Sequence, residues 1–366
     1  MKKDRLEDFY AISSEVLKEM KYVHAELNQL IETVQRDDVR LIEKEIAFLE
    51  EVYNFLHKWT LDVQLFQRLL RNNDQYIETV EGDTRSIPTS IELHEIPMGT
   101  ENVVNQTLLS KGAVIFTSAT LTIKGSFDFF LKNLGIGNNI KTEVFQSPYN
   151  YKENSRLIIA KDMPDVGKVK LSTYVESLVN HLIPLAETTK GRMLILFTSY
   201  EMLRLSYDLM KESGTLDDYV LMAQGITGGS KERLTKNFQK FEKAILFGTN
   251  TFWEGIDIPG EDLSCLVMVR LPFSPPDDPY IRAKSMELKK EGKNSFMELS
   301  LPEAVIRFKQ GIGRLIRSQH DRGLIIIFDR RIIEARYGQE FLQSIPEIPM
   351  VEADVNEMIS LSQQFL

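Results

Sequence analysis

Residues 323–328 read Gly-Leu-Ile-Ile-Ile-Phe, an apolar run that begins after Asp321-Arg322 and ends at Asp329. A half-exposed antiparallel strand alternates apolar and polar residues, whereas a parallel strand covered on both faces is apolar throughout. The run therefore predicts a buried parallel strand. Similar runs predict further strands at residues 113–116, 157–160, 193–197, 219–222, 244–247 and 264–269.

Segments with helical periodicity separate these runs. Because strands and helices alternate, the sequence predicts an α/β fold with an open parallel sheet that binds ligands at the carboxyl ends of its strands. The predicted helices span residues 168–187, 201–213, 230–241, 278–291 and 302–318.

The first 75 residues have a different pattern. Apolar residues recur at spacings of three, four and seven up to Val34 and again from Val39, and neither stretch contains Gly or Pro. This predicts two long helices joined by a short polar turn, either a generic coiled-coil hairpin or a specialised one. Residues 76–80 alternate, residues 81–83 predict a turn, and residues 86–96 predict an edge strand or loop.

Composition excludes several classes. The chain has 366 residues, a formal net charge of −9 and 43% hydrophobic residues, which excludes a disordered chain and a highly basic nucleic-acid coat but not a local binding groove. A single cysteine, Cys265, excludes an internal disulfide or a cysteine-rich metal site within this chain. The charged first residues are followed by no apolar run, so they do not resemble a secretory signal. No stretch approaches the ~20 apolar residues of a membrane helix. We expect a cytoplasmic protein that binds no metal and no membrane through this chain.

Two hydroxyl-rich stretches follow predicted strands. Thr117, Ser118 and Thr120 come after the run at 113–116, where they could orient a water, a phosphate or a neighbouring loop. Thr198 and Ser199 follow the run at 193–197, and one of them is expected to cap the helix that starts near Glu201. A capped helix N-terminus can also hold phosphate. Ordinary turn and cap roles remain open for both stretches.

The segment 248–260 contains three glycines and a proline, which predicts a tight loop. Trp253 offers a stacking face beside the acceptors Glu254 and Asp257, which suit ribose hydroxyls or an arginine. The alternative is a surface loop with a packed tryptophan.

The segment 310–317 places Gln310, Arg314 and Arg317 on one face of the predicted helix 302–318. Gly311 and Gly313 cost that helix about 1 kcal/mol each relative to alanine, so we expect a close approach to its backbone. Two guanidinium groups on one face suit the charge on a transferring phosphoryl group, whereas a merely solvated basic face would not explain the glycines.

Together these segments resemble the superfamily 2 helicases of the DinG/XPD type. Residues 117–121 (TSATL) resemble motif III and residues 197–200 resemble motif IV. The loop 248–260, with its core FWEGID, resembles motif V, and residues 310–317 (QGIGRLIR) resemble motif VI. The resemblance covers roughly residues 75–366, and the preceding hairpin is similar in place to the arch insertion of that family.

The resemblance implies an organisation into three regions. Residues 1–75 would be the arch-like hairpin, residues 76–150 the end of a first RecA-like domain, and residues 151–366 a complete second RecA-like domain. ATP would bind between the two RecA-like domains.

The resemblance also implies roles for the residues quoted above. Arg314 and Arg317 would be catalytic, and Gln310, Asp257, Gly255 and Glu254 would bind nucleotide. Thr198, Ser199, Thr249 and Trp253 would contact single-stranded DNA. Thr117, Ser118 and Thr120 would couple the nucleotide state to the grip on the strand.

The family's phosphate loop and DEAH box are absent from this sequence. A phosphoryl transfer needs the lysine and the Mg²⁺-binding carboxylate that those motifs supply. We therefore expect ATP and Mg²⁺ to act only with a missing N-terminal part of the same protein, and this chain alone to be inactive as an ATPase. An N-terminal exonuclease, an iron–sulfur cluster in that part, the polarity of translocation and the oligomeric state stay open. The alternative function is a non-catalytic module of a degenerate helicase that binds single-stranded nucleic acid or a partner and is attached to a nuclease.

Overall fold

The computed structural model describes residues 3–36, 43–69, 76–83, 90–99, 101–137, 139–165, 167–253, 258 and 260–366. The chain divides into two compact units. The first unit holds residues 1–100 with 282–284, and the second holds residues 101–281 with 285–366. The boundaries expected at residues 75 and 150 stay predictions.

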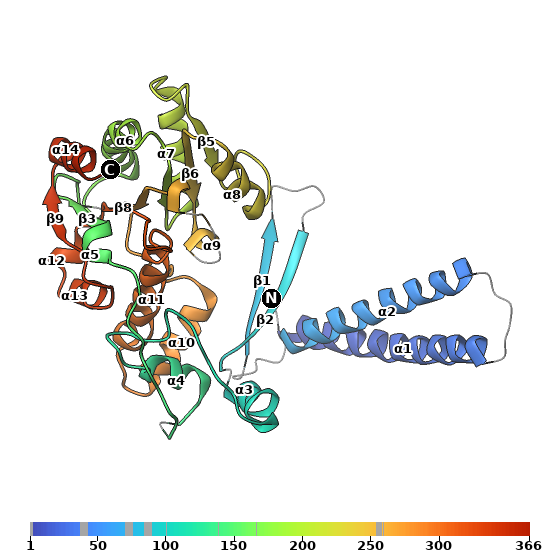
Figure 1. Ribbon diagram of the computed structural model, residues 1–366. Helices are drawn as coiled ribbons and strands as arrows, with labels where there is room; N and C mark the ends of the chain where they lie inside the picture. Colours follow the sequence, from blue (N-terminus) through green and yellow to red (C-terminus); the bar gives the residue numbers. More distant parts are fainter. Residues whose placement is uncertain are drawn as a thin grey trace. The chain divides into compact units, whose positions relative to one another are not determined.

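The first unit contains the expected helical hairpin (Figure 1). The ring of His24 stacks on that of Tyr53 with centroids 4.2 Å apart, and Gln67 Nε2 donates to the Ser13 hydroxyl over 3.1 Å. Ser13 lies nearer the start of α1 than His24 does, and its partner Gln67 lies nearer the end of α2 than Tyr53 does, so the pair is antiparallel. The helices are α1 (Lys3–Arg36) and α2 (Glu43–Leu69).

Two antiparallel strands follow, β1 (Tyr76–Asp83) and β2 (Ser90–Pro97), paired from Tyr76 with Pro97 to Asp83 with Ser90. The turn expected at residues 81–83 is wrong, because these residues continue β1 and pair with β2. The predicted edge strand is confirmed from Ser90 onward.

The second unit is built on a seven-stranded sheet of order β5-β6-β4-β7-β8-β3-β9, in which every pair is parallel. The predicted α/β class and parallel sheet are confirmed. The strands are β3 (Ser155–Ala160), β4 (Met193–Leu196), β5 (Val220–Ala223), β6 (Ala244–Gly248), β7 (Cys265–Met268), β8 (Gly323–Ile327) and β9 (Met350–Ala353).

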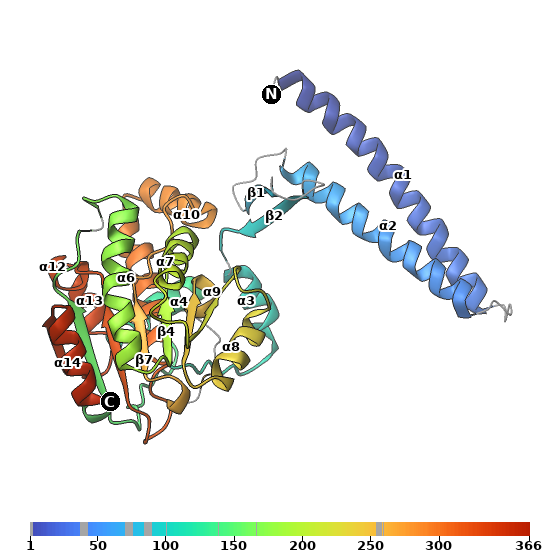
Figure 2. The same cartoon turned by 90° about the horizontal axis from the view of Figure 1, so that it is seen from above.

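Helices cover both faces of this sheet, which is why its central strands are apolar throughout. Side chains of α6, α7 and α14 pack on one face, and Figure 2 shows these three helices together. Side chains of α8, α9, α11 and α13 pack on the other face. These helices are α6 (Leu171–Thr188), α7 (Tyr200–Glu212), α8 (Lys231–Lys240), α9 (Asn250–Trp253), α11 (Leu301–Ile312), α13 (Gly338–Leu342) and α14 (Val355–Phe365).

Further helices belong to the second unit, apart from residues 282–284 of α10, which belong to the first. They are α3 (Glu101–Thr107), α4 (Asp128–Leu134), α5 (Tyr151–Asn154), α10 (Pro279–Lys290) and α12 (Arg331–Glu334). Residues 101–150 are anchored to the rest of the unit by ion pairs from Lys124 to Glu340 and from Lys132 to Glu298, each at 2.5 Å.

Three expectations need correction. The strand predicted at residues 113–116 is wrong, because this segment has no regular structure and no described strand pairs with it, leaving Ile115 90% exposed. The helix predicted to reach residue 318 ends at Ile312. The edge strand β9 was not predicted, since only its last residue is buried and it has no continuous apolar run.

Candidate nucleic-acid and nucleotide interface

The hydroxyl groups expected at the carboxyl edge of the sheet are there. Thr198 and Ser199 follow β4, and Thr249 follows the neighbouring strand β6. Ser199 is the N-cap of α7, with its Oγ accepting the N–H of Met202 over 3.4 Å. All three residues are half-buried.

Gln224, directly after β5, holds Thr249 in place. Its Oε1 accepts from both the backbone N–H and the hydroxyl of Thr249, each at 2.9 Å, and its Nε2 donates to the Thr251 hydroxyl over 3.2 Å. Sequence reasoning missed this residue. The signal was available, because Gln224 is a polar residue immediately after a buried strand, as Thr198 and Thr249 are.

Trp253 does not offer a stacking face. Its side chain is 1% exposed, and its Nε1 donates to the carbonyl of Phe197 over 3.3 Å. The expectation that a base stacks on this ring is therefore wrong, because the ring is part of the core between the sheet and α11. The alternative of a packed tryptophan is confirmed.

The same ring explains one glycine of the QGIGRLIR segment. A Cβ on Gly311 would lie 2.8 Å from Met268 Cε and 3.1 Å from the Trp253 ring. The expected close approach to the helix backbone is confirmed at Gly311, and the approaching groups are the core side chains of Met268 and Trp253. Gly313 has no such neighbour and is the C-cap of α11.

Arg314 and Arg317 lie beyond the end of α11, so the shared helical face expected for them with Gln310 is wrong. The backbone N–H groups of Arg317 and Ser318 both donate to Asp321 Oδ2, at 2.7 and 2.8 Å. A helix would need the Arg317 N–H for a carbonyl four residues earlier, so the carboxylate competes with helix formation here.

This turn lies at the amino edge of the sheet, opposite the hydroxyl groups. A Cβ on Gly323, the first residue of β8, would lie 2.5 Å from Leu315. Arg314 and Arg317 are both half-buried. Burial lowers the pKa of the Arg317 guanidinium, against the opposing attraction of Asp321.

Asp321 is a fixed anion at this edge. Burial alone would raise the pKa of its carboxyl, but hydrogen bonds from the Ser318 hydroxyl and from the N–H groups of Arg317 and Ser318 bring it below the usual value. A Cβ on Gly260 would lie 2.0 Å from Asp321 Cγ. The segment 248–260 therefore begins at the carboxyl edge and ends against the turn that carries the arginines.

Lys309 and Gln310 lie near the C-terminal end of α11. Gln310 Oε1 is buried and accepts no hydrogen bond from the described residues. Lys309 Nζ donates to the carbonyl of Thr122 over 2.5 Å, and burial lowers the pKa of this amine.

Thr117 and Ser118 are exposed and Thr120 is half-buried, in a turn where the Thr120 N–H donates to Ser118 Oγ over 3.3 Å. Glu254, Gly255 and Asp257 lie outside the described residues, so their expected roles stay predictions.

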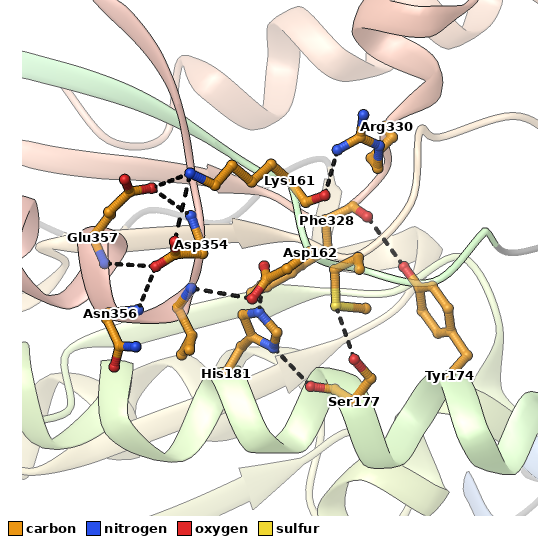
Figure 3. A network of polar contacts seen from close by, with 12 residues as sticks. Lys161, Asp162, Tyr174, Ser177, His181, Phe328, Arg330, Asp354, Asn356 and Glu357 are labelled. Carbon is orange, nitrogen blue, oxygen red and sulfur yellow. Dashed lines mark hydrogen bonds and ion pairs between the residues drawn. The ribbon is translucent and has the colours of Figure 1, made fainter.

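A second polar cluster lies at the carboxyl ends of β3 and β9 (Figure 3). His181 Nε2 is 2.9 Å from Asp162 Oδ1, and the Lys161 ammonium is 2.5 Å from Glu357. Asp354 caps α14 through a reciprocal pair of hydrogen bonds with Glu357. These contacts tie α6 and α14 to the sheet.

Among the described residues, no group of three or more His, Cys, Asp or Glu side chains is arranged to hold a metal ion. Within the same residues, no helix combines the length and apolar character needed to cross a membrane.

Comparison with known proteins identifies relatives. Residues 182–348 match the helicase C-terminal domain family. The chain is 38% identical over 298 residues to the 3'-5' exonuclease DinG of Bacillus subtilis, covering 81% of this chain and 32% of that protein. It is 35% identical over 336 residues to the ATP-dependent DNA helicase YoaA of Haemophilus influenzae, covering 88% of this chain and 50% of that protein.

Solved structures share the fold. A structure titled XPD_Helicase matches with a TM-score of 0.58 and 16% identity, over 93% of this chain and 64% of that one. At this identity the likeness concerns the fold alone. The chain spans about a third to a half of the length of the two curated relatives. The domain match and these two relatives show that the chain carries a helicase C-terminal domain and is related to DinG-type proteins over most of its length.

Proposed function

We propose that this chain is the second motor half of an ATP-dependent DNA helicase. Thr198, Ser199 and Thr249 contact the backbone of single-stranded DNA at the carboxyl edge of the sheet. Arg314 and Arg317 meet ATP from the amino edge, and the phosphate loop that holds ATP belongs to polypeptide outside this chain. The observation that carries the proposal is the position of two residues of the segment 248–260. Thr249 contacts Gln224 at the carboxyl edge of the sheet, and Gly260 contacts Asp321 at the amino edge, so this one segment connects the two edges.

The residues at the amino edge fit a nucleotide. A buried carboxamide oxygen that accepts no described hydrogen bond, that of Gln310, suits a donor on the bound ligand. The half-buried guanidinium of Arg317 is poorly solvated, which strengthens its attraction to developing negative charge. ATP with Mg²⁺ supplies the phosphoryl group that is transferred. Asp257, Gly255 and Glu254 complete the nucleotide contacts in this proposal.

Coupling between nucleotide and DNA would pass through residues 117–122. Lys309 precedes Gln310 and donates to the Thr122 carbonyl, so a displacement of α11 moves the turn that holds Thr117, Ser118 and Thr120.

The test joins this chain to the phosphate-loop half of a DinG-type relative. In that protein we expect Arg314→Ala to lower the ATPase kcat by about 10³-fold, the lower end of the range for an arginine finger. Binding of single-stranded DNA should be unchanged. Arg322→Ala, which removes the same charge from an exposed position, is the control. Unchanged kcat in Arg314→Ala would exclude the catalytic role.

A second function has one observation in its favour. The Bacillus subtilis relative is named an exonuclease and not a helicase. In that case the chain is a module that binds single-stranded nucleic acid for an attached nuclease, and it hydrolyses no ATP. The chimera distinguishes the two functions, since only a motor shows ATPase that single-stranded DNA stimulates.

A further inference from the structure

Arg270 follows β7 at the same edge of the sheet as the threonines. Leu196 of β4 pairs with Met268 of β7, so Thr198 and Arg270 each lie two residues beyond the same rung. On the other side of β4, Leu196 pairs with Gly248 of β6, and Thr249 is the residue that follows Gly248. Adjacent strands are about 4.8 Å apart. Thr249, Thr198 and Arg270 therefore follow three consecutive strands in one row.

The guanidinium of Arg270 is held on a rigid support. Its carbon Cζ lies 5.3 Å from the centroid of the Tyr174 ring. Tyr174 is 1% exposed, and its hydroxyl donates to the carbonyls of Val269 and Phe328 over 3.2 and 3.3 Å. Figure 3 shows the bond to Phe328. A cation stacked on a fixed aromatic ring loses little freedom when it binds an anion.

The charge of Arg270 is not cancelled by the nearest carboxylate. Asp329 already accepts three hydrogen bonds from the Arg331 guanidinium, at 2.9, 3.1 and 2.5 Å, and accepts the N–H of Leu271 over 2.9 Å. The three side chains Arg270, Arg331 and Asp329 therefore leave one net positive charge. Arg270 Nε is buried and makes no hydrogen bond within the described residues. Burial lowers the pKa of this guanidinium, as expected where water does not solvate it fully.

We infer that Arg270 is a phosphate contact for single-stranded DNA, which extends the row of Thr249 and Thr198 by one strand. This inference rests on the proposed function, because it assumes that the strand lies along this edge. The inference assigns the positively charged contact with the DNA phosphates to Arg270, which lies outside motifs III to VI. The two threonines contribute neutral hydroxyl groups, whereas Arg270 supplies a cation with a planar donor fork.

The test measures binding of this chain to fluorescein-labelled oligothymidylate of about 20 nucleotides, at salt concentrations from about 50 to 200 mM. We expect Arg270→Gln to raise Kd about tenfold at the lowest salt, as loss of one charge-assisted contact does. The slope of log Kd against log salt should fall by about 0.7, the value for one phosphate contact on a single strand. Arg270→Lys should keep the slope while it raises Kd less.

Arg322→Gln is the matched control. Its guanidinium also lies over an aromatic ring, 4.7 Å from the Phe365 centroid, but it precedes β8 at the opposite edge. It should leave both Kd and slope unchanged.

The possible outcomes distinguish a failure of the Arg270 contact from a failure of the proposed DNA-binding function. If the unmodified chain binds no oligothymidylate, the proposed function and the inference both fail. If it binds and Thr249→Val weakens binding while Arg270→Gln and Arg270→Lys change neither Kd nor slope, only the inference is overturned. A rise in Kd for Arg270→Gln with an unchanged slope also overturns it, because it indicates a structural role.

Discussion

Gly260 and Asp321 are in contact across the amino edge of the sheet, and a Cβ at residue 260 would lie 2.0 Å from the Asp321 carboxyl carbon. Asp321 in turn fixes the backbone of Arg317 and Ser318. The end of the segment 248–260 is thus packed directly against the anion that shapes the arginine turn, so a change at Gly260 reaches the arginines through a single side chain.

Gly260→Ala should destabilise the protein. The added methyl group meets a buried carboxylate that is held by three hydrogen bonds, and overpacking of this kind costs about 1–3 kcal/mol. Urea unfolding measures this free energy. Gly137→Ala is the control, because Gly137 is exposed and a Cβ there meets nothing within 4 Å. Equal stability of the two variants would contradict the contact.

Asp321→Asn should lower the free energy of unfolding at neutral pH by about 1–3 kcal/mol, since charge-assisted bonds to two N–H groups and a hydroxyl are weakened. The folded-state pKa of Asp321 lies below its usual value, which is about 3.9 in an unfolded chain. The stabilisation is therefore complete above that unfolded pKa and is lost as pH falls through the folded pKa.

Urea unfolding of both proteins at several pH values checks this expectation. The difference between wild type and Asp321→Asn should shrink below about pH 4. A difference that stays constant down to the acid limit would show that the carboxylate charge contributes nothing.

Gln224→Glu should weaken binding of single-stranded DNA. The substitution keeps an acceptor for Thr249 but places a negative charge at the carboxyl edge, where the phosphates are proposed to lie. We expect Kd to rise several-fold, about the effect of one repelled phosphate, and more at low salt than at high salt. Gln364→Glu on the exposed face of α14 makes the same charge change and should have no effect. Equal Kd values for both variants would remove Gln224 from the interface.

The emission of Trp253 should not respond to DNA. The chain has two tryptophans, so Trp59→Phe leaves Trp253 as the single reporter. Because Trp253 is 1% exposed, acrylamide should quench it little and oligothymidylate should not quench it further. Strong quenching by oligothymidylate would restore the stacking role that burial excludes.

The chain by itself should release phosphate from ATP no faster than a protein-free blank. It has no phosphate-loop lysine and no DEAH carboxylate, and an arginine alone cannot position the phosphoryl group. A malachite-green assay with and without oligothymidylate measures this. Turnover that increases with oligothymidylate would mean that an unrecognised phosphate site lies within these residues.

The sequence by itself determined the parallel sheet, because a strand covered on both faces must be apolar at every position, and 157–160, 193–197, 244–247 and 323–328 are. It also determined the helical hairpin through its apolar periodicity, and the capping role of Ser199. It could not identify 113–116 as an exposed segment, because an apolar run records only the tendency to be buried and not whether a partner strand exists.

Tertiary structure alone decided the character of the candidate site. From sequence, Trp253 was predicted to contact DNA and Gly311 to mark a close approach to the helix backbone, yet they face one another in the core. Gln224 and Asp321 gained their roles from residues 25 and 4 positions away along the chain. Arg314 and Arg317 lie beyond Ile312, where α11 ends, and the N–H of Arg317 binds Asp321 instead of a helical carbonyl. Periodicity encodes which face of a helix or strand is apolar. Only packing decides which polar groups come into contact, because the distance between two such groups depends on every strand and helix that lies between them.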